Sequence, residues 1–219
     1  MTAATAQSLS LENFKSYRDT GFLVVDTRSP QEFAEGFVPG AISIPFDNNF
    51  SDLVETLILS DRGLILVSHE GPAEAEALKA LGFSNIAGYL EGGMHTWLEA
   101  GEAPDMVISI GSHEFSLDFK HDDSLTVYDL RPALGFQQEH LKNATNKSVE
   151  GLLNEISDFP TNKTYYLMCY DGALSMGVNA LLKARGYHNF YHIAGGFKAV
   201  REEEKIELIA PNGKPNQGS

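Results

Sequence analysis

Short apolar runs alternate along the first half of the chain with segments whose apolar residues recur three or four positions apart. Uncharged runs of four residues are typical of strands buried on both faces, whereas the wider spacing is typical of amphipathic helices. The pattern predicts strands over residues 22–25, 41–44, 64–67 and 86–89, and helices over residues 10–17, 50–59, 72–81 and 94–100, with a further helix opening at Pro30. Strands and helices that alternate at these lengths predict a small doubly wound parallel sheet with helices on both faces.

The second half of the chain continues this alternation, with one expected departure. We expect strands over residues 127–128, 165–168 and 190–193, and helices over residues 136–141, 149–156, from Ser175 onward and from 197 toward 204. Within residues 113–120, however, Phe115, Leu117 and Phe119 occupy alternate positions, and a period of two predicts a strand. Together with residues 106–110, this segment is expected to form a hairpin in place of an opening helix.

Two motifs occur twice along the chain. Asp26-Thr27-Arg28 returns as Asp129-Leu130-Arg131, and Gly92-Gly93 returns as Gly195-Gly196, at a spacing of 103 positions in both cases (26 to 129 and 92 to 195). A fixed offset of this length indicates a duplicated domain. We therefore expect one domain over residues 1–104, a second over 105–210 and a flexible tail over 211–219, with a Gly/Pro-containing acidic connector at the boundary.

Cys169 is the only cysteine of the chain and follows directly after the uncharged run 165–168. A short loop then leads into a helix, so backbone N–H groups and the positive end of the helix dipole are expected to point at the cysteine. Such surroundings stabilise an anion on the sulfur and lower the pKa of the thiol toward neutrality. A buried, inert cysteine is the other interpretation. The position at the carboxyl end of a strand, where α/β sheets bind ligands, favours a functional residue.

This loop resembles the active-site loop of the rhodanese-like sulfurtransferases, in which a cysteine at the end of a parallel strand carries a persulfide. The glycine that the family commonly has three positions after the cysteine is Gly172, whereas the position that is often arginine is Leu174. In the first half the resemblance is carried by Asp26-Thr27-Arg28, residues 32–41, residues 90–93 and Trp97. It implies that Cys169 is catalytic and that the loop after it binds the substrate, through Tyr170, Asp171, Gly172, Ala173, Leu174 and Ser175.

The resemblance also implies an activity. A rhodanese-like sulfurtransferase moves sulfane sulfur from a donor, such as thiosulfate or a persulfide, to a nucleophilic acceptor through a persulfide on Cys169. The expected partners are a small sulfur donor and a thiol or cyanide-like acceptor, which can be a protein, and no cofactor is expected. Because Leu174 offers no cation and Asp171 adds a negative charge, we expect the dianion thiosulfate to be a poor donor.

The first half carries Ser68 where alignment of the third strands places Cys169 in the second half. Its loop is three residues shorter, since Ser68 lies 14 positions before Gly82 and Cys169 lies 17 positions before Gly186. Three carboxylates follow the serine and would repel an anion, namely Glu70, Glu74 and Glu76. A serine without a paired base is a poor nucleophile, so we expect the first domain to be catalytically silent.

Composition and charge indicate which kinds of partner and which cellular compartment to expect. The 219 residues are 42% hydrophobic and carry a net charge of −14, and such acidity argues against nucleic acid or an anionic membrane as a partner. One cysteine excludes a disulfide framework, and the first residues lack the pattern of a secretory signal, so a cytoplasmic protein without a membrane span is expected. His140, His188 and His192 have no ligand spacing, and we expect them to be surface or core residues and expect no metal.

The sequence leaves two alternatives open. Phosphatases and arsenate reductases of related fold use a cysteine and an arginine six positions later, but that position is Ser175 here, which removes the bidentate partner of a phosphoryl group. The alternative from a different class is a non-catalytic interaction or redox-sensing module, in which Cys169 does not transfer sulfur.

Overall fold

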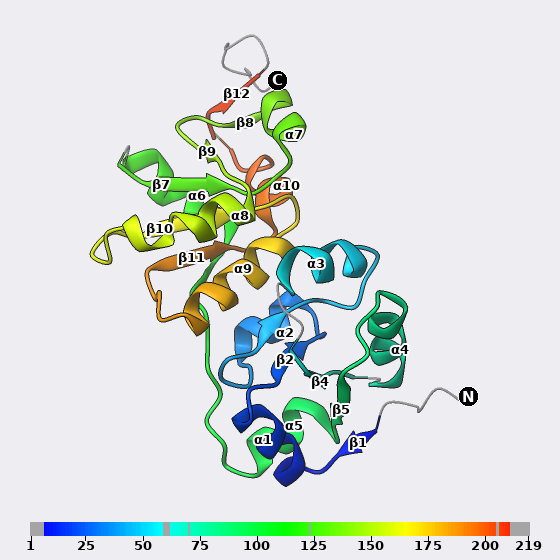
Figure 1. Ribbon diagram of the computed structural model, residues 1–219. Coiled ribbons are helices and arrows are strands. Elements are labelled where there is room, and N and C mark those ends of the chain that lie inside the picture. The colour runs from blue at the N-terminus through cyan, green and yellow to red at the C-terminus, as the bar shows by residue number, and fades with distance from the viewer. Residues whose placement is uncertain (1–6, 59–61, 70, 123, 205, 211–219) are drawn as a thin grey trace. The chain divides into compact units, whose positions relative to one another are not determined.

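The computed structural model describes residues 7–58, 62–69, 71–122, 124–204 and 206–210 (Figure 1). The chain divides into two compact units between Met106 and Val107, two residues beyond the boundary expected from the sequence. The connector explains the difference, because Asp105 still pairs with the first unit. Its N–H donates to Phe37 O at 2.8 Å, and the Phe37 N–H donates to Asp105 O at 3.0 Å. The expected tail, 211–219, lies outside the described residues.

The first unit contains a sheet of five parallel strands in the order β1-β5-β4-β2-β3. The strands are β1 (Ser8–Leu9), β2 (Leu23–Asp26), β3 (Ile42–Ser43), β4 (Leu64–Val67) and β5 (Ile86–Leu90). The helices are α1 (Leu11–Asp19), α2 (Pro30–Glu35), α3 (Phe50–Leu57), α4 (Pro72–Ala80) and α5 (Gly93–Glu99). The predicted elements of this half are confirmed, and β1 is an additional strand. Residue 59, where the third helix was expected to end, lies outside the described residues.

The second unit repeats this arrangement, with five parallel strands in the order β6-β11-β10-β7-β9. The strands are β6 (Ser109–Ile110), β7 (Thr126–Asp129), β9 (Thr145–Asn146), β10 (Tyr165–Met168) and β11 (Phe190–Ile193). The helices are α6 (Ser112–His121), α7 (Ala133–Gln138), α8 (Val149–Asn154), the 3-10 helix η1 (Ile156–Asp158), α9 (Ala173–Ala184) and α10 (Gly196–Val200). One strand order used twice supports the duplication, and the predicted class of two tandem α/β domains with parallel sheets is confirmed.

The hairpin expected at residues 113–120 is wrong, because this segment is helix α6. Phe115 and Phe119 are four positions apart, and their rings lie on one side of the helix with centroids 5.4 Å apart. Phe115 is fully buried against Tyr166, whereas Leu117 between them is 46% exposed. Three apolar residues at alternate positions therefore fit a helix as well as a strand, and in the helix Phe115 is buried and Phe119 partly buried on one side.

A short antiparallel pair extends the second unit and was not predicted. β8 (His140–Leu141) pairs with β12 (Leu208–Ile209), and Leu141 and Leu208 are both buried in the core. The helix expected over 136–141 therefore ends at Gln138. The last helix ends at Val200 rather than near residue 204, and the helix expected over 149–156 ends at Asn154 before η1.

The repeated Asp-x-Arg triplets form equivalent buried ion pairs at the ends of β2 and β7. Arg28 Nη2 lies 2.6 Å from Asp26 Oδ2, and Arg131 Nη2 lies 2.6 Å from Asp129 Oδ2. Each guanidinium also donates to a backbone carbonyl eight positions after the arginine, Gly36 O in the first unit and Glu139 O in the second, at 2.8 Å in both. These pairs tie the carboxyl end of a strand to the loop that follows it.

Candidate active site

The central strand β10 carries the chain to Cys169. β10 lies between β7 and β11, and its four residues are buried, which accounts for the uncharged run in the sequence. Cys169 is itself only 3% exposed. The loop ends at Gly172, whose φ of +97° lies in the left-handed region that favours glycine. Helix α9 begins immediately afterwards, at Ala173 rather than at Ser175 as the sequence suggested.

Three hydrogen-bond donors point at the sulfur of Cys169. The N–H of Gly172 lies 3.2 Å from Sγ, the N–H of Ser175 3.3 Å, and the Ser175 hydroxyl 3.5 Å. Of the six loop residues expected to supply amides, the structure thus brings the amides of Gly172 and Ser175 to the sulfur. The Ala173 N–H instead donates to Asp171 Oδ1 at 3.1 Å. Tyr170 is exposed and Leu174 is half-buried.

The first residues of α10 hold the loop through backbone hydrogen bonds. The N–H of Phe197 donates to Cys169 O and that of Lys198 donates to Tyr170 O, both at 2.8 Å. This close approach requires Gly196, because a Cβ atom there would lie 2.5 Å from Cys169 O. The Gly-Gly pair of the sequence repeat therefore positions the loop, a role that the sequence analysis did not assign to it.

The electrostatic setting of the thiol differs from the expectation. Burial raises the pKa of Cys169 above its ordinary value, and the Asp171 carboxylate adds to the rise, although hydrogen bonds from Ser175 and Gly172 act in the opposite direction. Asp171 Oδ1 lies 3.9 Å from Sγ. The sequence predicted a lowered pKa from the loop amides alone, and the desolvation that accompanies a buried position outweighs them.

His192 is the site residue that sequence reasoning missed. It lies on β11 and is 2% exposed, and its Nδ1 is 3.0 Å from the Ser175 hydroxyl oxygen. Burial lowers the pKa of His192 to about 4, so the imidazole is neutral at neutral pH. The sequence analysis left open whether it is a surface or a core residue and offered no link to Cys169, because the two residues are 23 positions apart (169 to 192). Adjacent parallel strands, β10 and β11, bring them together.

A groove of about 520 Å³ opens beside the loop. Its walls come from the loop, α7 and α10, and the residues that line it are Arg131, Pro132, Leu134, Gly135, Gln138, Glu139, Tyr170, Phe197 and Arg201. Leu134 is 70% exposed and Tyr170 is 57% exposed, so apolar surface faces the groove. The Arg131 guanidinium lies 3.5 Å from the centroid of the Phe197 ring. Both arginines of the groove are paired with carboxylates, Arg131 with Asp129 and Arg201 with Glu139. Leu174 adds no cation to the loop.

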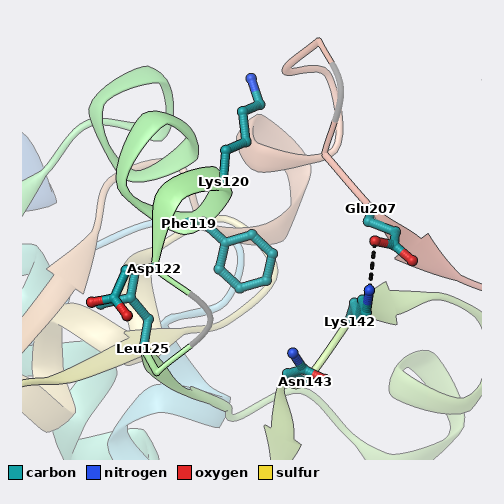
Figure 2. A pocket seen from close by; sticks show the side chains of 7 residues that line it. All are labelled: Phe119, Lys120, Asp122, Leu125, Lys142, Asn143 and Glu207. Atoms are coloured by element: carbon teal, nitrogen blue, oxygen red, sulfur yellow. Dashed lines mark hydrogen bonds and ion pairs between the residues drawn. The ribbon is translucent and has the colours of Figure 1, made fainter.

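A second, smaller cavity of about 160 Å³ lies in the same unit, and Figure 2 shows its lining. The residues are Phe119, Lys120, Asp122, Leu125, Lys142, Asn143 and Glu207. None of them belongs to the Cys169 loop, and two of its charged groups form an ion pair, with Lys142 Nζ 2.9 Å from Glu207 Oε2. We therefore place the candidate chemistry at Cys169 and not here.

The equivalent loop of the first unit carries a serine in place of the cysteine and has a buried carboxylate beside it. Ser68 is buried, and its hydroxyl accepts the N–H of Gly71 at 2.8 Å. Glu74 is only 3% exposed, and its Oε1 accepts from the Thr27 hydroxyl at 3.3 Å, while Oε2 has no hydrogen-bond partner among the described residues. Glu76 is exposed, and Glu70 lies outside the described residues. A buried carboxylate close to the serine loop makes this position unfavourable for an anion.

The residues that the structure describes contain neither a candidate metal site nor a membrane-spanning helix. Within this part of the chain, no group of three or more His, Cys, Asp or Glu side chains is arranged to hold a metal ion. Among the same residues, no helix has the length and apolar character needed to cross a membrane.

Fold and site together define a protein of two duplicated α/β domains, one of which holds a buried cysteine beneath converging hydrogen-bond donors. The chain matches the rhodanese-like domain over residues 10–100 and again over 114–203. It therefore belongs to the rhodanese-like family, in a tandem form.

Similar proteins include several named thiosulfate sulfurtransferase GlpE. The one from Pseudomonas aeruginosa is 31% identical over 96 residues, which cover 42% of this chain and 84% of the relative. The one from Vibrio cholerae is 30% identical over 71 residues, which cover 32% and 67%.

Two solved structures also show a likeness to this chain. A rhodanese-like domain protein from Staphylococcus aureus has a TM-score of 0.41 and 23% identity, covering 46% of this chain and 97% of that protein. A thiosulfate sulfurtransferase from Pseudomonas aeruginosa has a TM-score of 0.41 and 16% identity, covering 97% of this chain. This chain spans 45% of the length of that second protein.

Proposed function

We propose that this protein is a sulfurtransferase that works through a persulfide on Cys169. The thiolate attacks the outer sulfur of a donor, the bond between that sulfur and the rest of the donor breaks, and the leaving group departs with the electron pair. From thiosulfate the leaving group is sulfite. A nucleophilic acceptor then attacks the outer sulfur of the persulfide and regenerates the Cys169 thiolate, so that the reaction is covalent catalysis in two half-reactions.

The observation that carries this proposal is the convergence of donors on one sulfur. The two backbone N–H groups of Gly172 and Ser175 and the Ser175 hydroxyl lie 3.2 to 3.5 Å from Sγ, and preorganised donors of this kind stabilise negative charge without reorganising. An inert core cysteine has no need of them. The charge appears on the attacking thiolate, on the persulfide and on the thiolate that leaves, so the same three donors serve both half-reactions.

The groove beside Tyr170 is the proposed route by which the sulfur donor and the acceptor reach Cys169. A small donor and a thiol or cyanide-like acceptor must each reach a sulfur that is almost fully buried, and the groove walls meet the loop at Tyr170. Its apolar lining, which includes Leu134, Tyr170 and Phe197, suits an acceptor with an apolar body, including a side chain of a protein acceptor. The proposed chemistry uses no cofactor and no metal.

We further propose that the first domain is catalytically silent. Its loop presents the Ser68 hydroxyl rather than a thiol, and that hydroxyl is occupied by the Gly71 N–H. The buried Glu74 carboxylate would oppose any anion formed at this position. A hydroxyl cannot hold a persulfide, because sulfur transfer needs a sulfur nucleophile.

Steady-state kinetics with thiosulfate or a low-charge persulfide as donor, and cyanide or a thiol as acceptor, test the proposal. We expect parallel double-reciprocal plots, as a covalent intermediate requires, and no turnover from Cys169→Ser. Turnover by Cys169→Ser would refute the persulfide mechanism. Absence of turnover with every donor tried would favour the non-catalytic interaction or redox-sensing module instead.

A further inference from the structure

An unbroken set of hydrogen bonds joins Cys169 to a buried histidine. The Ser175 hydroxyl oxygen lies 3.5 Å from Cys169 Sγ, 3.2 Å from Gly172 O and 3.0 Å from His192 Nδ1. The strand fixes the backbone that carries the imidazole. The backbone N–H of His192 donates to Ile108 O at 2.9 Å, and β11 pairs with β10. Its buried neighbours on β11, Phe190 and Ile193, are apolar, so an imidazole here would be costly without a polar partner.

We propose that His192 is a positioning residue, which acts through the Ser175 hydroxyl to direct a hydrogen bond at the sulfur of Cys169. A hydroxyl has one hydrogen, and here three acceptors surround it. Which of them receives that hydrogen depends on the imidazole tautomer. When Nδ1 carries a hydrogen, it donates to Oγ, and the hydroxyl is free to donate to Sγ. When Nδ1 is bare, it accepts the hydroxyl hydrogen and the sulfur loses this donor.

The two arrangements match the two states of the thiol. In the protonated state, the Cys169 S–H donates to Oγ and the hydroxyl donates to Nδ1, with the ring hydrogen on Nε2. In the thiolate or persulfide, the sulfur needs a donor, so the hydroxyl turns to Sγ and the ring hydrogen moves to Nδ1. The thiol proton passes to solvent, and the imidazole is neutral before and after. The proposal rests on the sulfur chemistry proposed above and identifies how its anion is stabilised.

The groups around His192 are consistent with a ring that stays uncharged while its tautomer changes. Burial holds the pKa of His192 near 4, so the ring changes tautomer rather than charge at neutral pH. Among the described residues, the ionisable groups hydrogen-bonded to this set of atoms are Cys169 and Asp171, both in the loop. Asp171 opposes a negative sulfur, which makes the Ser175 donor more necessary. On α9, Asn179 lies next to the backbone of the histidine strand and is uncharged.

The test measures the thiol without any sulfur donor, by the pH dependence of Cys169 alkylation in the full chain with iodoacetamide. Asparagine can place a polar atom near the position of Nδ1, whereas leucine cannot. We expect His192→Leu to raise the alkylation pKa by about one unit or more, which is the size of a lost hydrogen bond to a charged group, and His192→Asn to restore most of the wild-type value. Equal pKa values in wild type and His192→Leu would overturn the proposal.

A double-mutant comparison separates positioning from packing. In a Ser175→Ala background, His192→Leu should change the alkylation pKa no further, because the link between ring and sulfur is already absent. Additive shifts would mean that His192 acts by packing alone. If His192→Leu fails to fold, NMR of the wild-type imidazole decides the matter. The ring hydrogen should move from Nε2 to Nδ1 as pH passes the thiol pKa, and an unchanged tautomer would contradict the proposal. These readouts need no sulfur transfer, so they can fail or succeed independently of the proposed function.

Discussion

Ser175 contacts the sulfur of Cys169 twice, through its backbone N–H at 3.3 Å and through its hydroxyl at 3.5 Å. The two residues are six positions apart, and the first turn of α9 brings them together because the loop between them closes at Gly172. The site therefore depends on the backbone path of the loop as much as on the thiol. Each variant below changes one part of this arrangement.

The first prediction concerns Gly172→Ala. A side chain at φ +97° is strained by about 1–2 kcal/mol, and its Cβ would lie 3.1 Å from Gly195 N and from His192 Cε1. We expect the loop to shift and kcat/KM for sulfur transfer to fall about ten- to hundredfold, since small displacements of a reacting group have effects of this size.

Gly186→Ala is the matched control. Gly186 lies in the same unit with φ +89°, but a Cβ atom there meets nothing within 4 Å. Both variants should lose a similar free energy of unfolding in urea titrations, whereas kcat/KM should fall only for Gly172→Ala. An equal loss of activity in both variants would show that general destabilisation, not the loop, is responsible.

The second prediction concerns donor choice and uses Leu174→Arg. The wild type should use thiosulfate poorly, because Leu174 contributes no charge and the nearby Asp171 carboxylate repels a dianion. One well-placed charged contact is worth about 1.5–3 kcal/mol, so kcat/KM for thiosulfate should rise by about one to two orders of magnitude. Leu174→Gln should give little gain. If Leu174→Arg also shows no gain, the geometry of the loop and not the missing charge sets donor choice.

The third prediction concerns the first domain. Ser68→Ala removes the acceptor of a buried N–H, that of Gly71, so stability should fall by about 1–3 kcal/mol while sulfur transfer stays unchanged. Ser68→Cys supplies the missing thiol, yet the short loop and the buried Glu74 should prevent persulfide formation at residue 68. Peptide mass mapping after donor treatment measures this. A persulfide at residue 68 would mean that only the serine had silenced this domain.

The fourth prediction concerns stability and pH. Burial lowers the pKa of His192 from its ordinary value of 6.5 to about 4 in the folded chain. Between these values the unfolded chain binds a proton at His192 that the folded chain does not bind. The stability that depends on a neutral His192 is therefore fully present above pH 6.5 and is lost as the pH falls toward 4. The loss amounts to about 3 kcal/mol at most, from about 1.36 kcal/mol per pKa unit. Urea titrations at several pH values should show a shallower fall for His192→Asn than for wild type, and parallel curves would contradict the assignment.

The sequence predicted most of the fold because local patterns determine most of its elements. The uncharged runs at β2, β4 and β10 lie in the middle of their sheets, where both faces are buried, and Ser10, Ser29 and Ser148 each accept the N–H that a helix N-cap should accept. The strand predicted at residues 113–120 was wrong because Phe115, Leu117 and Phe119 fit the period of a helix as well as that of a strand. β8 and β12 escaped it because a pairing of two residues across 67 positions (141 to 208) has no local signal.

The candidate site was predictable only in part. Cys169 and its loop follow from the order strand, loop, helix, and the family resemblance adds the persulfide. The histidine could not be found, because its relation to Ser175 depends on strand pairing and on burial. The thiol pKa was mispredicted for the same reason: the loop amides are visible in a sequence, whereas the desolvation of Sγ is a property of the folded unit.

The mass of the intact protein after donor treatment tests the central claim most directly. A persulfide adds one sulfur atom to one thiol, so wild type treated with a sulfane-sulfur donor should gain about 32 Da, located on Cys169, and should lose it again when cyanide is added. Cys169→Ser should gain nothing under the same conditions. A wild-type protein that gains no mass from any sulfane donor, or an equal gain in Cys169→Ser, would contradict sulfur transfer through Cys169.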